Sequence, residues 1–128
     1  MSINRNIYVI AGCDLTKYKT DKYSDWRWTE AGEELLCKRQ IGQICLFDDP
    51  MDGSHLYLGY LLADGDEVSM PTYIASIRSL YDYSLDTAND IINKIEELGK
   101  MGIINITDDD WANDKNLRYS LLCFEEWT

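Results

Sequence analysis

Residues 88–104 contain the clearest structural signal in the sequence, ANDIINKIEELGKMGII. Its apolar residues recur at the three- and four-residue spacing that places side chains on one face of a helix. They are Ala88, Ile91, Ile92, Ile95 and Leu98. Gly99 then occupies the position where a left-handed residue often ends a helix. The stretch therefore predicts a helix over 88–98 capped by Gly99, followed by a strand over 103–106.

The flanking residues predict a second helix before this one and a returning strand after it. Pro71 suits the first position of a helix, because no N–H is needed there. The apolar residues behind it again share one helical face, at Tyr73, Ile74, Ile77, Leu80 and Tyr81. Residues 82–84 break the pattern. A polar turn over 107–116 leads into the alternating run 117–121, which predicts a strand.

The first half of the chain predicts two strands and a short helix. Residues 7–11 (IYVIA) and 43–47 (QICLF) are β-branched and aromatic runs bounded by turn residues. Thr29 followed by glutamates predicts a helix over 30–37, since both suit the free N–H groups of a first turn. Residues 14–25 predict a loop or a short exposed strand. Residues 55–63 fit either a buried strand or a short helix.

Helix, tight turn, helix and hairpin together resemble the winged-helix family. The run 97–104 (ELGKMGII) is similar to that family's passage from recognition helix to wing. Residues 55–63 would supply the family's first helix if they are helical. The resemblance covers residues 55–124 and implies an α+β fold. In it an N-terminal α/β region, 1–54, with strands and one short helix, precedes a winged-helix-like region, 55–128. A single compact domain over both regions is the alternative.

The predicted second helix and wing depart from what DNA binding requires. Reading DNA needs Arg, Lys, Asn or Gln at base edges and cations at phosphates. Asn89 and Asn93 suit adenine, but carboxylates surround them, at Asp86, Asp90, Glu96, Glu97, Asp108, Asp109, Asp110 and Asp114. Carboxylates beside a phosphate backbone oppose binding. We therefore do not expect this surface to bind DNA directly.

The composition is that of a folded, strongly acidic domain. The 128 residues are 45% hydrophobic and 27% charged, which is ordinary for a globular chain. Residues 1–64 hold seven Lys/Arg and ten Asp/Glu, whereas residues 65–128 hold five and 13, a net −8 of the total −11. Such a field repels phosphate and anionic membranes and attracts basic protein surfaces. Acidity that only maintains solubility is the alternative.

No stretch of the chain carries a complete cofactor, metal or catalytic signature. Residues 48–53 (DDPMDG) begin like a calcium loop, but Pro50 takes a ligand position and Gly59 stands where the closing glutamate belongs. His55 is the only histidine, and the cysteines lack metal-binding spacing, at Cys13, Cys37, Cys45 and Cys123. We therefore expect no enzyme, no cofactor, and buried reduced thiols.

Aromatic residues supply the remaining signal, with four Trp and nine Tyr against two Phe. Tyr and Trp dominate interface hot spots, because each combines an apolar body with a polar end. Trp26 and Trp28 are expected to fill the core. Trp111 lies among carboxylates and is expected to be exposed. We assign the partner-binding surface to Trp111 and the eight acidic residues named above between 86 and 114.

Small size, acidity, abundant Tyr and the lack of a catalytic motif are similar to anti-CRISPR and other DNA-mimic anti-defence proteins as a class. That similarity implies an inhibitor from a phage or mobile element. Its target would be a basic nucleic-acid-handling protein, such as a CRISPR effector or a defence nuclease. A winged-helix transcription regulator and a small enzyme without a recognisable motif are the alternatives, and a homodimer stays open.

The sequence also predicts where such an inhibitor acts. Its first residues do not resemble an export leader, and no apolar stretch approaches the roughly 18 residues of a membrane span. We therefore expect a cytoplasmic protein that does not bind membranes.

Overall fold

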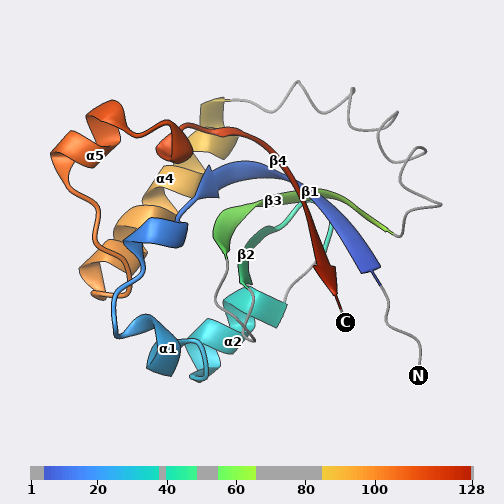
Figure 1. The fold of residues 1–128 in the computed structure, drawn as a ribbon, viewed down its shortest axis with the longest axis horizontal. Coiled ribbons are helices and arrows are strands. Elements are labelled where there is room, and N and C mark those ends of the chain that lie inside the picture. Colours follow the sequence, from blue (N-terminus) through green and yellow to red (C-terminus); the bar gives the residue numbers. More distant parts are fainter. Residues whose placement is uncertain (1–4, 38–39, 49–54, 66–84, 128) are drawn as a thin grey trace.

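The computed structural model describes residues 5–37, 40–48, 55–65 and 85–127, in which helices pack on an antiparallel sheet (Figure 1). The elements in chain order are β1 (Arg5–Asp14), η1 (Thr16–Tyr18), α1 (Tyr23–Trp26), α2 (Glu30–Cys37), β2 (Ile44–Asp48), β3 (Leu56–Gly65), α4 (Leu85–Lys100), α5 (Asp108–Asn113), η3 (Lys115–Leu117) and β4 (Ser120–Trp127). Mixed helices and antiparallel strands confirm the predicted α+β class. The predicted helix over 71–80 lies outside the described residues.

The sheet has the order β2-β3-β1-β4, and each neighbouring pair is antiparallel. β1 pairs with β3 along one edge and with β4 along the other. Strands from residues 1–54 and from residues 55–128 therefore hydrogen-bond to each other within one sheet. The ambiguous run 55–63 lies largely in β3 and so is a strand, not a helix.

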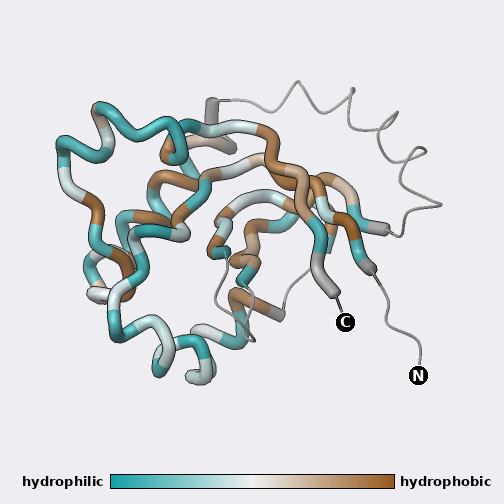
Figure 2. Tube along the Cα trace, viewed as in Figure 1, coloured by the Kyte–Doolittle hydropathy of each residue, from teal (hydrophilic) through white to brown (hydrophobic). Residues whose placement is uncertain are grey.

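One face of the sheet carries the main core. Side chains from the strands, from α4, and from the segments around α1 and α2 form a single buried cluster there. The fully or nearly fully buried contributions of α4 are Ile91, Ile95 and Leu98, which are three of the residues predicted to share a helical face. Figure 2 shows the hydrophobic segments along the strands, whereas α5 and the turns beside it are mostly hydrophilic.

The opposite face of the sheet carries an aromatic cluster. Tyr8 and Phe47 are buried, with ring centroids 5.6 Å apart, and the ring of Phe124 lies 5.6 Å from Tyr8 and 5.5 Å from Phe47. His55 stacks on Tyr57 at 4.8 Å with only 12° between the ring planes. Burial of these rings draws β4 against β1, because Phe124 stands on β4.

The short helix α2 begins as the sequence predicts. The Thr29 hydroxyl accepts a hydrogen bond from the Gly32 amide at 3.2 Å, which satisfies one of the free N–H groups of the first turn. The strands predicted over 7–11 and 43–47 lie within β1 and β2, apart from Gln43. Residues 14–25, predicted as a loop or a short exposed strand, are half helical, because η1 and the first three residues of α1 lie within them.

The C-terminal end of α4 corrects the predicted cap. The helix continues through Gly99, and Gly102 is the left-handed residue, with φ +78°. The Ile103 amide donates to the Leu98 carbonyl at 3.1 Å, and the Gly102 amide donates to the Gly99 carbonyl at 3.0 Å. These are the two hydrogen bonds of a Schellman motif. The prediction placed the cap three residues too early, because either glycine fits the sequence pattern.

The predicted wing hairpin is wrong. Ile104 makes only an isolated bridge, to Lys19, and β4 pairs with β1 instead of with residues 103–106. The physical reason is burial: Ile103 and Ile104 pack into the main core, while β4 brings Phe124 onto the aromatic cluster. Ile103 and Ile104 are each only 2% exposed, which is more complete burial than a two-stranded hairpin would allow.

Candidate functional site

Three of the predicted partner-binding carboxylates lie on the exposed side of α4. Asp90, Glu96 and Glu97 are all exposed. Asp90 accepts a hydrogen bond from the Tyr60 hydroxyl at 3.0 Å, and Glu97 forms an ion pair with Lys94 at 2.9 Å. Asp86 belongs to the first turn of the same helix, but its side chain lies outside the described residues. Asp90 and Glu97 therefore each use part of their hydrogen-bonding capacity within the chain.

The segment 107–116 is helical, which corrects the predicted polar turn. The Thr107 hydroxyl accepts from the Asp110 amide at 3.1 Å, while the Asp110 carboxylate accepts from the Thr107 amide at 2.9 Å. This capping box starts α5. Asp108 and Asp109 are exposed in the first helical turn, where the helix dipole stabilises negative charge. Two adjacent acids therefore face solvent, while Asp110 has a structural role.

Asp114 is held within the structure by a cation and a phenol. Its carboxylate accepts hydrogen bonds from Lys17 at 2.7 Å, from the Tyr18 hydroxyl, and from the Asn116 amide at 2.9 Å. These contacts, the Lys17 bond first, lower the pKa of Asp114 from 3.8 to about 2. Asp114 is thus partly neutralised by its own chain, and it contributes less to an acidic surface than the sequence predicts.

Trp111 is half-buried, not exposed as predicted. Its ring packs against the main core and lines a groove of about 340 Å³ between α5 and the end of α4. Glu96 and Lys100 line the same groove from α4, and Ile104 and Ile106 give it an apolar floor. The ring is partly covered because it packs against the main core beside the end of α4. The structure therefore places Glu96 and Trp111 on the same groove.

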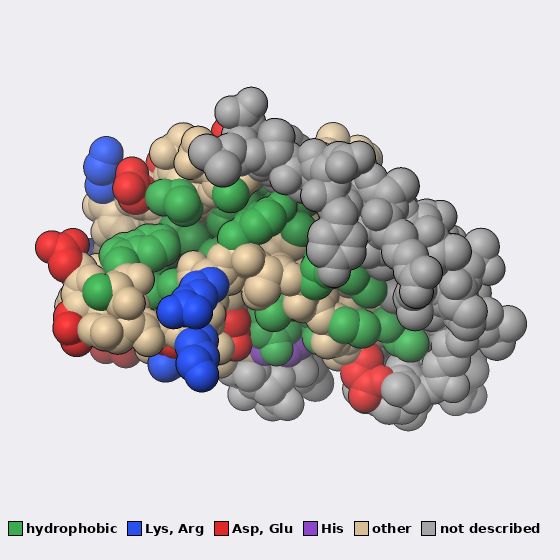
Figure 3. All heavy atoms as spheres, turned by 90° about the horizontal axis from the view of Figure 1, so that it is seen from above, with side chains coloured by type: hydrophobic (Ala, Val, Ile, Leu, Met, Phe, Trp, Pro, Cys, Tyr) green, Lys and Arg blue, Asp and Glu red, His purple; other side chains and the backbone are tan. Residues whose placement is uncertain are grey.

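Acidic and basic side chains both gather at the end of the molecule that carries α5. Figure 3 shows red and blue side chains close together at this end, with a band of hydrophobic side chains extending toward the strands. Lys17, Lys115 and Arg118 are exposed basic residues of the neighbouring segments. The predicted surface is therefore acidic at the start of α5 and mixed in charge around Asp114.

Trp28 is the exposed aromatic residue that the sequence analysis missed. Its side chain is 68% exposed, although we expected it in the core. The Arg27 guanidinium lies over the Trp28 ring, 4.3 Å from the centroid, and donates hydrogen bonds to the buried Asp48 carboxylate at 2.6 and 3.1 Å.

The Asp48 carboxylate also accepts a hydrogen bond from the Tyr23 hydroxyl at 2.7 Å. Burial, reinforced by Asp48, raises the pKa of Tyr23.

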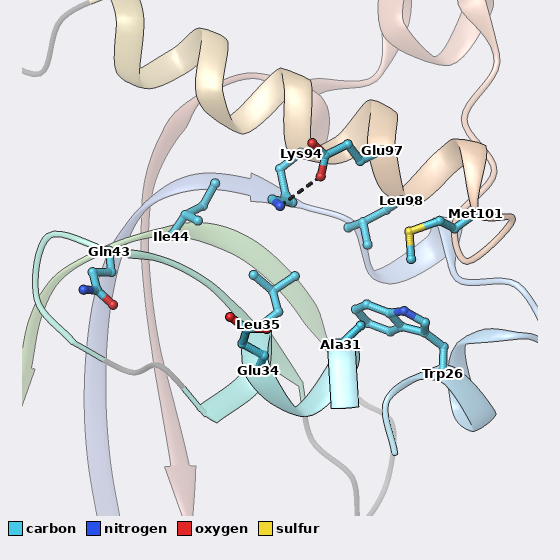
Figure 4. Close-up of a pocket in the computed structure, with 10 residues that line it drawn as sticks. All are labelled: Trp26, Ala31, Glu34, Leu35, Gln43, Ile44, Lys94, Glu97, Leu98 and Met101. Carbon is cyan, nitrogen blue, oxygen red and sulfur yellow. Dashed lines mark hydrogen bonds and ion pairs between the residues drawn. The ribbon is translucent and has the colours of Figure 1, made fainter. Parts of the chain in front are cut away.

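A larger cleft, of about 500 Å³, lies between α2 and α4 (Figure 4). The side chains of Ala31 and Leu35 form one wall, and those of Leu98 and Met101 form the other. The Trp26 indole closes one end. One sequence signal pointed to this cleft, because Glu97 is the single predicted site residue among the residues that line it.

The thiol and imidazole groups of the described residues do not form a nucleophile pair at Cys13. Its Sγ donates to the Leu117 carbonyl at 3.3 Å within the main core, while His55 packs on the rings of the opposite face. Burial, and then the charge of Asp14, raise the pKa of the Cys13 thiol to about 11. Cys45 is fully buried as well. A catalytic thiol needs an accessible, lowered-pKa environment, and Cys13 has neither.

Alkylation should follow this order of burial. At about pH 8, roughly one Cys13 thiol in a thousand would be the reactive thiolate. We expect iodoacetamide to label the exposed Cys123 within minutes and to leave Cys13 unlabelled until the chain is unfolded in urea. Peptide mass spectrometry separates the sites. Labelling of Cys13 in the folded chain as fast as Cys123 would contradict its burial and raised pKa.

The described segments contain neither a cluster of metal ligands nor a membrane-spanning helix. Within 5–37, 40–48, 55–65 and 85–127, no group of three or more His, Cys, Asp and Glu side chains is placed to hold a metal ion. No helix in this part of the chain is both long enough and apolar enough to cross a bilayer.

Comparisons with known proteins give the chain no relative. No protein-family model, no curated protein and no solved structure matches it.

Proposed function

We propose that this chain is an acidic protein-binding inhibitor that occupies a basic, nucleic-acid-handling surface of its target. The observation that supports this most is the pair of exposed carboxylates at the start of α5, Asp108 and Asp109, close in sequence to the half-buried Trp111. Glu96 lies in the same groove as that ring. Carboxylates around an aromatic edge suit a surface where Lys and Arg surround an apolar pocket.

The mechanism is competition with nucleic acid. A net charge of −11 accelerates the approach to a basic groove, and carboxylates then pair with cations that otherwise hold phosphates. Bound this way, the chain excludes nucleic acid without a catalytic step or cofactor. The proposed targets are CRISPR effectors and defence nucleases in the cytoplasm of a bacterial host, which makes a phage or mobile element the proposed source.

The predicted alternative, a transcription regulator, is the second candidate, but it would have to bind DNA through α4 without the predicted wing. Asn89 and Asn93 are exposed on α4, and asparagine is a residue that reads adenine. Asp90 and Glu96 on the same helix oppose a phosphate backbone, so the inhibitor is favoured. A gel shift at low salt distinguishes the two, since tight, sequence-dependent DNA binding would support the regulator and remove the inhibitor.

Reversing the two exposed acids of α5 should weaken target binding. The test measures binding to, and inhibition of DNA cleavage by, a panel of purified CRISPR effector nucleases and restriction endonucleases. For a nuclease that the chain inhibits, Asp108→Lys/Asp109→Lys is expected to raise Kd about tenfold, because two attractions become repulsions. Raising salt from about 0.1 M to about 1 M, which shortens the Debye length from about 10 Å to about 3 Å, should also weaken binding.

The matched control is Asp21→Lys/Asp25→Lys. Both residues are exposed near α1, and their reversal changes net charge by the same amount. It should leave Kd within about twofold of the unaltered chain. Equal losses in the two variants would reduce the effect to net charge alone and contradict a specific site. A panel in which no nuclease is bound would contradict the proposed targets.

A further inference from the structure

The α2–α4 cleft has an apolar interior between two charged rims. Its apolar lining comes from α1, α2, β2, α4 and the turn after α4, at Trp26, Ala31, Leu35, Ile44, Leu98 and Met101. Figure 4 shows Leu35 and Leu98 facing each other from the two helices, with Trp26 at one end and Gln43 at the other. The volume of about 500 Å³ is within the range of ligand-binding sites.

The backbone at Trp26 packs closely against α2. The backbone around it contacts α2 so closely that a Cβ on Gly32 would lie 2.7 Å from the Arg27 Cα. The Thr29 hydroxyl also donates to the Trp26 carbonyl at 2.6 Å. The backbone that carries the indole is therefore fixed before anything binds, which lowers the entropy that binding must overcome.

The indole of Trp26 also carries an unused donor. Its Nε1–H is buried and has no hydrogen-bond acceptor in the described part of the chain. Such a group destabilises the structure until an acceptor reaches it. Met101 lines the cleft beside it and is 47% exposed, and methionine side chains adapt readily to a bound partner. Figure 4 shows Met101 beside the indole, and movement of this side chain is the route by which we expect a partner atom to reach the Nε1–H.

The rims of the cleft determine the charge of what can enter. Glu34 stands on the α2 rim and Glu97 on the α4 rim, where Lys94 pairs with it at 2.9 Å. Glu30 and Glu33 are exposed on the same short helix as Glu34. Among the described residues that line the cleft, two carboxylates and one ammonium group surround an apolar interior.

We propose that this cleft binds a helical segment of a partner protein whose apolar face is flanked by Lys or Arg. Its apolar side chains enter between α2 and α4, its cations meet Glu34 and Glu97, and one of its polar atoms accepts the Trp26 hydrogen. An amphipathic helix in a groove is an established mode of peptide recognition. The inference rests on the proposed function in one respect, that the partner is a basic protein, and it adds a second contact with that partner.

The test uses designed peptides, because no partner is needed to probe the cleft. Three peptides of roughly 14 residues share one length, which is near the minimum for a helix in water. One alternates Leu and Lys in an amphipathic helical pattern, one has the same pattern with Glu for Lys, and one has Ser for Leu while keeping Lys. The readout is the ¹H–¹⁵N spectrum of the tryptophan indoles, with the Trp26 signal assigned by Trp26→Phe.

The Leu/Lys peptide should shift the Trp26 indole signal and leave the Trp28 and Trp111 signals in place. The Leu/Glu and Ser/Lys peptides should bind at least tenfold more weakly, since the first loses the charge match and the second loses the apolar contact. Equal binding of the Ser/Lys peptide would overturn the proposal, because general attraction to an acidic chain would then explain it.

Matched variants locate the contact. Met101→Gln should raise the Kd of the Leu/Lys peptide about tenfold by removing apolar surface from the cleft. The control is Leu121→Gln on β4, because Leu121 is 45% exposed and the charge change is again zero. Equal loss in both variants would overturn the proposal. A dimer that forms with rising concentration and is abolished by Met101→Gln would also overturn it, since a second copy would then be the occupant.

The two proposals fail separately. Asp108→Lys/Asp109→Lys should not change peptide binding to the cleft. Met101→Gln leaves the acidic residues of α5 unaltered. Peptide binding as described, without inhibition of any nuclease, would support the cleft and contradict the proposed target class. Nuclease inhibition without binding of the Leu/Lys peptide would support the proposed target class and contradict the cleft proposal.

Discussion

Replacing Asp48 with alanine is expected to lower the free energy of unfolding by about 3–5 kcal/mol. Asp48 is the last residue of β2, and its side chain is only 5% exposed. It accepts two hydrogen bonds from Arg27 and one from Tyr23. Its removal would leave a guanidinium that is 13% exposed without its counter-ion, together with a buried hydroxyl. The cost comes mainly from this orphaned charge.

Urea denaturation followed by tryptophan fluorescence measures this loss. The control is Asp25→Ala, which removes an exposed carboxylate from α1 and should change the free energy of unfolding by less than about 0.5 kcal/mol. Adding Arg27→Met to Asp48→Ala should recover part of the loss, because no unpaired cation would remain. Equal effects of Asp48→Ala and Asp25→Ala would show that the pair contributes nothing to stability.

Gly12→Ala is expected to destabilise the fold by at least about 4 kcal/mol, or to prevent folding. Gly12 on β1 faces Gly59 on β3 in the register of the two inner strands. A Cβ on Gly12 would lie 2.5 Å from the Gly59 Cα and 2.8 Å from the Leu58 carbonyl carbon. Both contacts are with backbone, so no side chain can move aside. The two strands would have to separate and lose their ladder of hydrogen bonds.

Gly99→Ala is the matched control for this substitution. A Cβ there meets no atom within 4 Å, and the residue lies inside α4. Alanine should therefore stabilise the chain by about 0.5–1 kcal/mol, because glycine is the poorer helix former. Circular dichroism reports folding even if Gly12→Ala is too unstable for a urea titration. A folded Gly12→Ala with unchanged stability would contradict the close approach of β1 and β3.

Local patterns predicted those elements whose stability is local or whose apolar face is continuous. The helix around Ile91 and Ile95 followed from apolar spacing, and α2 followed from its Thr29 cap. α5 was missed although the sequence carried its signal. Thr107 and Asp110 stand at the spacing of a capping box, but three adjacent aspartates favoured a turn. A carboxylate at the third helical position was the decisive feature.

Non-local pairing was the part that the sequence could not specify. The run 117–121 predicts a strand, but Leu117 ends η3 and the strand is β4, which begins at Ser120. Its pairing with β1 instead of with residues 103–106 depends on which faces become buried. The tryptophans show the same limit. Trp28 is exposed while its neighbour Arg27 turns inward to Asp48, and Trp111 is partly covered because it packs against the main core. Neither outcome follows from the residues adjacent to each ring.

The pairing of β1 with β4 has a consequence during protein synthesis. Residues 5–12 hydrogen-bond to residues 120–127, so one edge of an inner strand has no partner until the intervening residues and β4 itself have been translated. At roughly 5–20 residues per second, this interval keeps that edge open for on the order of 5–20 s. During this time Tyr8 and Ile10 lack the β4 residues that cover them. Chaperones that hold exposed strands would have their main opportunity then, before residues 120–127 are available to pair.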